Sequence, residues 1–429
     1  MTVALLFDQF RKNLAVKNAD KISTRYDTIT GRLNFDFWEV ESKTANSLQV
    51  GSYGRRTAID GVSDLDMVFV LPDDLLSRYK NQEGNGPSAM LQEVRKSLLR
   101  TYSNSKITAD GQVVAVHFHG YRVEVLPAFE DSDGNFTYGD ANKGGSWKKS
   151  MPRPEISAAN DMNRRTGGVY KNACKMVRAW KNHHGVGIGG LLVDTLVHRF
   201  FEVTDDYDNC GYSSYGGLTR DLFAYLAGLP EQSYWHALGS GQQVKCKAKF
   251  QNKAKKAARH CDEALNETTL IKQANKWRPV FGYVFPTAQS LTKSTAITES
   301  AGPNEEFIEN LYSVDVSYTL SINCEAEAPS YKEFLRHLLK NGKRVPIGKK
   351  LKFFVTDESN IPGDAQIFWK VKNEGEVAVQ RKQLRGEIVP DNGLRERRET
   401  SDFTGDHYVE AYAILDGVCV ARDRLSVPI

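Results

Sequence analysis

The chain of 429 residues lacks any long uninterrupted apolar run. A membrane-spanning helix needs roughly 20 consecutive apolar residues, and the best candidate, GIGGLLVDTLV from Gly187, is short and interrupted by Asp194. The N-terminal segment MTVALLFDQFRKN has neither the basic leader nor the long apolar region of a signal peptide. We therefore expect a cytoplasmic protein with no membrane partner.

Cysteine pairs and a strong charge bias are missing as well. The six cysteines are scattered, without a CxxC pair or histidines at zinc-site spacing, which predicts reduced thiols with no shared role. A formal net charge of +4 is too small to indicate a nucleic-acid-binding protein by itself. The apolar fraction of 40% is typical of a globular protein, and the length predicts two or three domains.

The hydrophobic pattern changes twice along the chain. Residues 1–150 begin with an apolar helix and continue with strand-like runs at Leu65–Leu71, Gln112–Phe118 and Tyr121–Leu126. Residues 151–290 have the helical spacing of apolar residues, and residues 291–306 resemble a linker in composition. Residues 307–429 form several short strands with turns between them, which predicts a β sandwich. The fold class is therefore α+β.

The segment VGSYGRRTAIDGVSDLDMVFVLP carries the strongest signal for chemistry. In a strand that begins near Asp64, Asp64 and Asp66 point to one face because successive side chains alternate. Two neighbouring carboxylates repel each other unless a cation lies between them, and Mg²⁺ prefers such oxygen ligands. Mg²⁺, or Mn²⁺, is therefore the predicted cofactor.

Two further elements complete this candidate site. Glu124, in YRVEVLP, is a third ligand if its strand lies beside the first; an exposed edge-strand Glu paired with Arg122 or Lys106 is the alternative. Three carboxylates can hold two metal ions that activate an attacking hydroxyl and stabilise a leaving pyrophosphate. Gly51 and Ser52 lie at a predicted turn where backbone N–H groups and the Ser hydroxyl can hold a triphosphate.

This combination of motifs resembles the nucleotidyltransferases related to cyclic GMP-AMP synthase and oligoadenylate synthetase, and among them the bacterial CD-NTase (SMODS) enzymes. GSYGRRTAIDGVSDLDM is similar to the family's Gly-Ser and Asp-x-Asp elements, VEVLPAF to its third-carboxylate strand, and WRPVFGYVFP to the end of its helical domain. The β-rich remainder resembles the C-terminal sensor domain attached to some of these enzymes. The resemblance implies a polymerase β-like nucleotidyltransferase core followed by a helical nucleotide-binding domain.

The resemblance also implies residue roles. Asp64, Asp66 and Glu124 would be catalytic and bind the metal, and nucleoside triphosphates such as ATP would be the substrates. Arg56, Lys175 and Arg178 would join Gly51 and Ser52 in binding the nucleotide; a solvated helix face is the alternative for Lys175 and Arg178. Arg178 stands where family members often carry Lys, and Gly190 where Ser is often found. These two departures leave the base selection open.

The implied product is a cyclic di- or trinucleotide that activates a separate effector protein in anti-phage defence. A linear oligonucleotide, ribo or deoxyribo, is the enzymatic alternative. A catalytically idle regulator that senses a nucleotide is the alternative from another class of protein. Aromatic and cationic residues of the C-terminal domain suit a nucleotide or oligonucleotide ligand, but packing and surface roles explain them equally well; they are Trp369, Lys370, Arg385, Arg397, Arg398 and His407.

Overall fold

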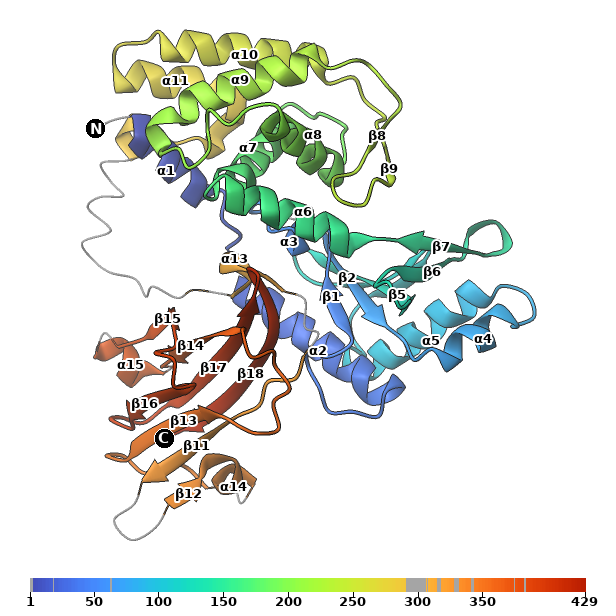
Figure 1. Cartoon of the computed structure of the whole chain (residues 1–429), viewed down its shortest axis with the longest axis vertical. Coiled ribbons are helices and arrows are strands. Elements are labelled where there is room, and N and C mark those ends of the chain that lie inside the picture. Colours follow the sequence, from blue (N-terminus) through green and yellow to red (C-terminus); the bar gives the residue numbers. More distant parts are fainter. Residues whose placement is uncertain are drawn as a thin grey trace. The chain divides into compact units, whose positions relative to one another are not determined.

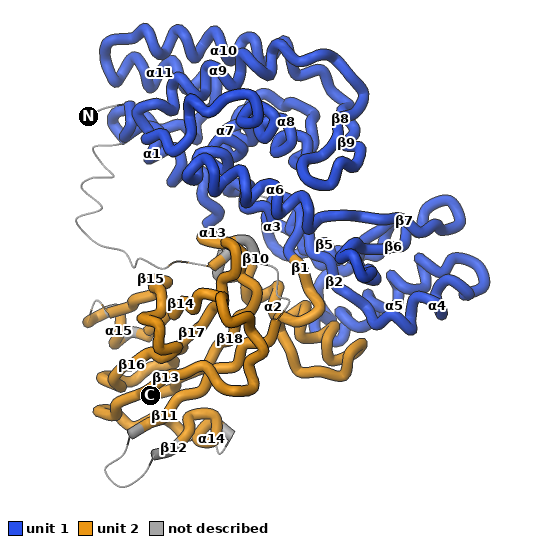
Figure 2. Tube along the Cα trace, in the orientation of Figure 1, with its two compact units in different colours: residues 1–18, 49–300 blue, residues 19–48, 301–429 orange. Residues whose placement is uncertain are grey.

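The computed structural model describes residues 3–17, 19–61, 64–290, 306, 308–314, 318–327, 332–340, 343–373, 375–381 and 383–429. It divides into two compact units (Figure 2). Unit 1 comprises residues 1–18 and 49–300, and unit 2 comprises residues 19–48 and 301–429. Except for Glu306, the predicted linker 291–306 lies outside the described residues. The predicted helical domain falls in unit 1, as does the predicted catalytic domain apart from residues 19–48. The separation of these two domains stays a prediction.

A mixed sheet forms the first part of unit 1, in the order β1-β2-β5-β4-β3, with β6 paired to β5 and β7 to β6 (Figure 1). Its strands are β1 (Ser47–Gln49), β2 (Asp64–Val70), β3 (Ile107–Asp110), β4 (Val113–His117), β5 (Arg122–Glu130), β6 (Phe136–Asp140) and β7 (Ser146–Ser150). The helices among them are α3 (Gly51–Gly54), α4 (Asp74–Lys80) and α5 (Gly86–Thr101). β2 and β5 run parallel, whereas β4 is antiparallel to both β3 and β5. The three strands predicted between residues 65 and 126 are confirmed as β2, β4 and β5.

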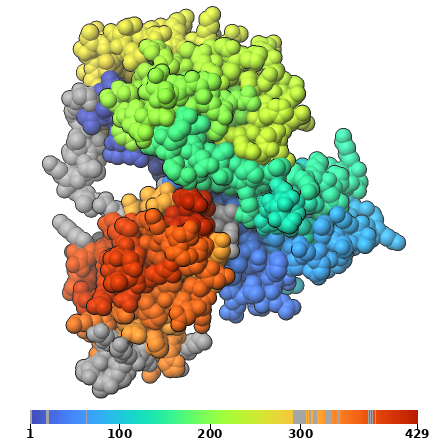
Figure 3. Space-filling model, viewed as in Figure 1, coloured from blue at the N-terminus to red at the C-terminus, as the bar shows by residue number. Residues whose placement is uncertain are grey.

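Helices form the rest of unit 1. They are α1 (Val3–Asn13), α6 (Pro152–Arg165), α7 (Val169–His183), α8 (Gly190–Glu202), α9 (Tyr215–Gly228), α10 (Gln251–Leu265) and α11 (Leu270–Phe281), with a two-stranded sheet of β8 (Tyr234–His236) and β9 (Gln243–Lys245) and short turns at η1 (Asn142–Gly144), η2 (Tyr212–Ser214) and η3 (Gly282–Val284). They bury an aromatic core, in which Trp180 and Trp277 are 0% and 1% exposed. The space-filling view shows the helices from α6 to α11, in green and yellow, as one continuous mass (Figure 3). No helix within the described ranges is long and apolar enough to cross a membrane.

Unit 2 contains a β sandwich. One sheet has the order β10-β18-β17-β14-β15 and the other β12-β11-β13-β16, and buried side chains of both sheets, such as Phe353 and Trp369, share one core. The strands are β10 (Ser313–Val314), β11 (Ile322–Glu327), β12 (Lys332–Phe334), β13 (Lys350–Val355), β14 (Gln366–Lys372), β15 (Arg385–Pro390), β16 (Glu396–Thr400), β17 (Asp406–Leu415) and β18 (Val418–Pro428). The predicted α+β class, with a sandwich at the C-terminal end, is confirmed.

Unit 2 also contains a helix from near the beginning of the chain. α2 (Ala19–Phe37) belongs to it, together with the short helices α13 (Ile308–Leu311), α14 (Leu335–Lys340) and α15 (Glu376–Gln380). Arg422 of β18 forms an ion pair with Asp27 of α2, and its guanidinium lies 6.0 Å from the ring centre of Tyr26. Residues 19–48 therefore group with the sandwich, although the sequence pattern predicts them to lie in the catalytic domain.

Candidate active site

The register of β2 and β5 brings the predicted acidic residues together. Asp66 lies opposite Glu124, and Asp64 lies opposite Arg122, in the parallel pair. Residues two apart in a strand share a face, so all four side chains project from the same side of the sheet. β5 is flanked by β2 and β4, which excludes the edge-strand position that the alternative for Glu124 requires, although the pairing with Arg122 is present.

Asp66 is the electrostatically strained member of this group. Burial and the neighbouring Glu124 carboxylate raise its pKa to about 6, and Asp64 adds to this rise, whereas Arg55 and Arg122 oppose it. Such a shift is typical of carboxylates that share a site. A positive charge placed beside Asp66 would relieve this strain.

Arg122 supplies positive charge to the other two carboxylates. Its Nε lies 2.8 Å from Asp64 Oδ1, and its Nη2 lies 2.5 Å from Glu124 Oε1. In this arrangement, no group of three or more His, Cys, Asp or Glu side chains within the described ranges converges closely enough to hold a metal ion. The Arg122 guanidinium thus stands between two of the three predicted ligands.

Gly51 makes room for the Asp66 carboxylate. Its φ is +64°, and a Cβ at this position would lie 1.9 Å from Asp66 Oδ2. Both the left-handed backbone and the close approach therefore require glycine. The next residue, Ser52, accepts hydrogen bonds at its carbonyl from the N–H groups of Thr57 and Ala58, at 2.9 and 3.0 Å.

The donor set fits a hard divalent cation. Three carboxylates from adjacent strands are the oxygen ligands that Mg²⁺ prefers, and the raised pKa of Asp66 reflects mutual repulsion that a cation would remove. Gly51 keeps the approach to Asp66 free of a side chain. Arg122 is the group that would have to move.

Two of the predicted nucleotide-binding cations lie near each other. The pKa of Lys175 falls to about 8 because of burial and of the positive charges of Arg56 and Arg11. Lys171, one turn earlier on α7, also has a lowered pKa, through burial and the charges of Arg56 and Lys175, and donates to Asn160 Oδ1 at 2.6 Å. The arrangement concentrates positive charge that an anion would stabilise.

Arg178 lies in a different environment. It is 7% exposed, and its Nη2 lies 2.6 Å and 2.7 Å from the two carboxylate oxygens of Asp194 and 3.0 Å from the carbonyl of Gly190. A Cβ on Gly190 would lie 2.6 Å from Arg178 Nη1. The guanidinium of Arg178 therefore occupies the space that a side chain at residue 190 would need, and this steric relation links the two positions. Contact of Arg178 with a triphosphate stays a prediction.

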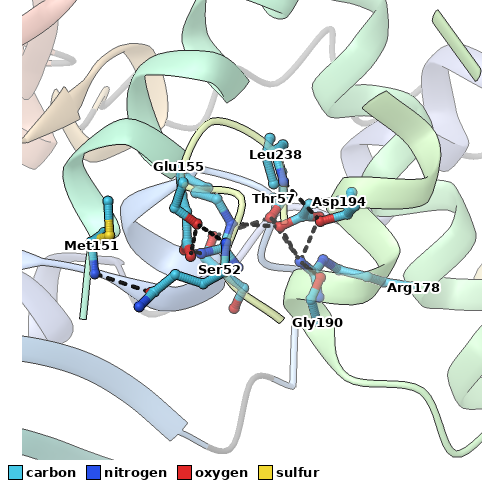
Figure 4. A network of polar contacts seen from close by, with 12 residues as sticks. Ser52, Thr57, Met151, Glu155, Arg178, Gly190, Asp194 and Leu238 are labelled. Carbon is cyan, nitrogen blue, oxygen red and sulfur yellow. Dashed lines mark hydrogen bonds and ion pairs between the residues drawn. The ribbon is translucent and has the colours of Figure 1, made fainter. Parts of the chain in front are cut away.

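The sequence motifs do not reveal the buried network around Asp194 (Figure 4). Asp194 Oδ2 accepts from Arg55 Nε and from Thr57 Oγ1, both at 2.8 Å. Arg55 Nη1 lies 3.4 Å from Glu155 Oε2, and Ser240 donates to Glu155 Oε1 at 3.1 Å. The available signal was an acidic residue within the apolar run LLVDTLV, because a buried carboxylate requires partners.

The six candidate residues of the C-terminal domain lie in two different environments of unit 2: two are buried and paired, and the other four lie in or beside a cavity. Trp369 and Lys370 are each 1% exposed; the Trp369 indole donates to Asp391 at 2.8 Å, and the Lys370 ammonium lies 3.6 Å from Glu410. A cavity of about 340 Å³ lies between the sheets, and its lining includes Arg385, Arg398 and His407. Arg397 contacts Glu399, which is also in that lining.

Family comparisons match both ends of the chain. Residues 1–163 match the Second Messenger Oligonucleotide or Dinucleotide Synthetase (SMODS) domain, and residues 303–429 match the Adenylyl/Guanylyl and SMODS C-terminal sensor domain. A probable cyclic nucleotide synthase from Bacillus cereus (strain VD146) is 22% identical over 275 residues, which cover 55% of this chain and 81% of that protein.

Three solved structures are among those similar to this chain. CdnC of E. coli MS115-1, solved with ATP, is 13% identical with a TM-score of 0.48 and covers 67% of this chain and 99% of its own. CdnG of Bradyrhizobium diazoefficiens, in complex with GTP, is 11% identical with a TM-score of 0.49, covering 68% and 97%. The apo form of Vibrio cholerae DncV is 14% identical with a TM-score of 0.47, covering 57% and 69%.

Proposed function

Because the chain belongs to the SMODS (CD-NTase) nucleotidyltransferases and carries the sensor domain of that family, we propose that it joins nucleoside triphosphates into a cyclic di- or trinucleotide second messenger. The single observation that carries the proposal is the register that sets Asp66 opposite Glu124, with Asp64 on the same face and Gly51 against Asp66. The resemblance inferred from the sequence motifs is confirmed at the level of the family.

Asp64, Asp66 and Glu124 hold Mg²⁺ or Mn²⁺ in this proposal. When bound, the ions neutralise phosphate charge and activate a ribose hydroxyl of the acceptor nucleotide. That oxygen forms a bond to the α-phosphorus of the donor, and the bond to pyrophosphate breaks. The protein contributes chiefly by positioning the reactants.

The triphosphate is held by Ser52, Arg56 and Lys175. Within the described part of the chain the Ser52 hydroxyl has no hydrogen-bond partner, so it is available to a phosphate oxygen. Lys175 and Arg56 supply positive charge close to each other, and phosphate contacts satisfy such groups.

The test is incubation of the purified protein with α-labelled ribo- and deoxyribonucleoside triphosphates and Mg²⁺ or Mn²⁺, followed by phosphatase treatment and mass spectrometry. A phosphatase-resistant product is expected, since a ring has no terminal phosphate. A phosphatase-sensitive ladder would instead support the linear alternative.

Variants separate the enzyme from the idle regulator. Asp64→Asn and Asp66→Asn should abolish product, because an amide is a poor ligand for a hard cation. Both substitutions preserve side-chain size, so thermal unfolding of the variants checks that the loss is not one of folding. Unchanged product in either variant would contradict the assignment of the carboxylates.

In the proposed biological role, the product activates a separate effector protein in anti-phage defence. The defence role rests on the family relation. Its test is co-expression of this protein with a candidate effector in cells that are challenged with phage. Protection should be lost in the Asp66→Asn variant.

The ligand of the sensor domain is proposed to be a nucleotide that binds in the cavity of unit 2. Apolar side chains of both sheets, such as Phe353 and Val409, form part of the lining, and Arg398 and His407 also contribute to it. This combination suits a flat base with a charged tail. The test measures nucleotide binding in a protein that carries Asp64→Asn and Asp66→Asn, with a chelator present. In this background, Arg398→Ala should lower the residual binding. Arg344→Ala, a change at an exposed arginine outside the cavity lining, should leave it unchanged.

A further inference from the structure

The carboxylate of Asp194 is the common acceptor of a network that joins several parts of unit 1 (Figure 4). Asp194 lies on α8 and is 0% exposed. It accepts from Arg55 and Thr57, which follow α3, and from Arg178 of α7. Four contacts of 2.6 to 2.8 Å therefore converge on one side chain.

The charges in this network are balanced. Arg55 and Arg178 face Asp194, and Arg55 also lies 3.4 Å from Glu155, so two guanidinium groups are matched by two carboxylates. Removing one partner of a buried ion pair strongly destabilises the folded protein, because the other charge is left buried without a counter-charge. Loss of any one of these four charged groups would therefore destabilise unit 1.

Thr57 connects the network to the turn that carries Ser52. Thr57 is 0% exposed, and its N–H donates to the Ser52 carbonyl at 2.9 Å, while its hydroxyl oxygen lies 3.4 Å from that carbonyl and donates to Asp194 at 2.8 Å. Arg178 donates to the same hydroxyl oxygen at 2.9 Å. The position of the Ser52 backbone is thus linked to α7 and α8 through one hydroxyl group.

We propose that Asp194 is a positioning residue that acts through Thr57: it holds the Ser52 turn in place for the triphosphate of the donor nucleotide. The inference rests on the proposed function, because it assigns a role to residues around the same nucleotide site. Among the described residues, the hydrogen bonds of the Asp194 carboxylate go to Arg55, Thr57 and Arg178, and not to the carboxylates of β2 and β5 or to the Ser52 hydroxyl. Its effect is on nucleotide affinity and leaves metal affinity unchanged.

The experiment compares Thr57→Val with Thr57→Ser. Valine keeps the volume and removes the hydroxyl, whereas serine restores it; Asp194→Asn is avoided because the two arginines would then lack a charged partner. A matched control is Thr195→Val, a buried threonine beside Asp194 that accepts from the Leu238 N–H at 3.3 Å and is not one of the groups that join Asp194 to the Ser52 turn. ATP binding, Mn²⁺ binding and thermal unfolding are measured on the full chain for each variant.

We expect Thr57→Val to weaken ATP binding and raise KM by about tenfold, the value of one lost hydrogen bond. Mn²⁺ affinity should stay at the wild-type level, Thr57→Ser should restore ATP binding, and Thr195→Val should bind ATP like wild type. Equal ATP affinity in Thr57→Val and wild type would overturn the inference, as would a joint loss of ATP binding, Mn²⁺ binding and stability. If wild type itself bound no nucleotide, the proposed function would fail first.

Discussion

Replacing Gly51 with alanine tests the geometry of the acidic site directly. The new Cβ would lie 1.9 Å from Asp66 Oδ2, and real Cβ contacts essentially never fall below 3.0 Å, so the carboxylate must move by about 1.1 Å. A displacement of this size at a reacting centre costs on the order of 100-fold in rate. The positive φ adds about 1–2 kcal/mol of backbone strain.

Gly84→Ala separates the two effects. Gly84 has φ +82° and no atom within 4 Å of a built Cβ, so this variant suffers the backbone strain without a clash. Product formation from α-labelled triphosphates should be near wild type in Gly84→Ala and about 100-fold lower in Gly51→Ala, while urea unfolding shows a loss of stability in both. Equal product rates in the two variants would refute the reasoning that Gly51 exists to accommodate Asp66.

Three further predictions concern the charged groups around the site. Arg122→Met should raise Mn²⁺ affinity of the nucleotide-free protein by about tenfold in a binding titration, because the guanidinium that competes for Asp64 and Glu124 is removed; a lower affinity would show that Arg122 helps to form the metal site. Lys175 has a pKa lowered to about 8, so its positive charge is lost as pH rises through this value and ATP affinity should fall above pH 8; Lys175→Met should show no such step. Gly190→Ser should lower the free energy of unfolding by about 1–3 kcal/mol, because the added side chain displaces Arg178. The same change combined with Arg178→Lys should cost less, and additive losses in this double-mutant cycle would contradict the steric relation.

Local patterns were sufficient to place the acidic residues of β2. The alternation of Asp64 and Asp66 follows from the strand period alone, whereas the neighbour of that strand is decided by contacts between residues about 60 positions apart. From the sequence, Glu124 could therefore be assigned only on the condition that its strand lies beside the first. The structure places it opposite Asp66 and also reveals Arg122 between the carboxylates, which the sequence offered only as an alternative explanation.

Helical spacing was less informative for α7. It correctly places Lys175 and Arg178 on one face, because residues three apart are neighbours on a helix. Helical spacing does not predict which residues that face contacts. Lys175 lies near Arg56, whereas Arg178 contacts Asp194 from α8. Partners supplied by a second helix depend on tertiary packing, which no single-helix pattern contains.

The path of the chain through its two units limits how the protein can be divided. The chain leaves unit 1 after residue 18, returns to it at residue 49, and leaves again after residue 300. A shortened chain that ends at residue 300 would keep α2 but lose Arg422, which pairs with Asp27 and lies over the ring of Tyr26. No single truncation therefore yields either unit intact, and a study of the synthetase without its sensor requires residues 19–48 to be replaced by a designed connection.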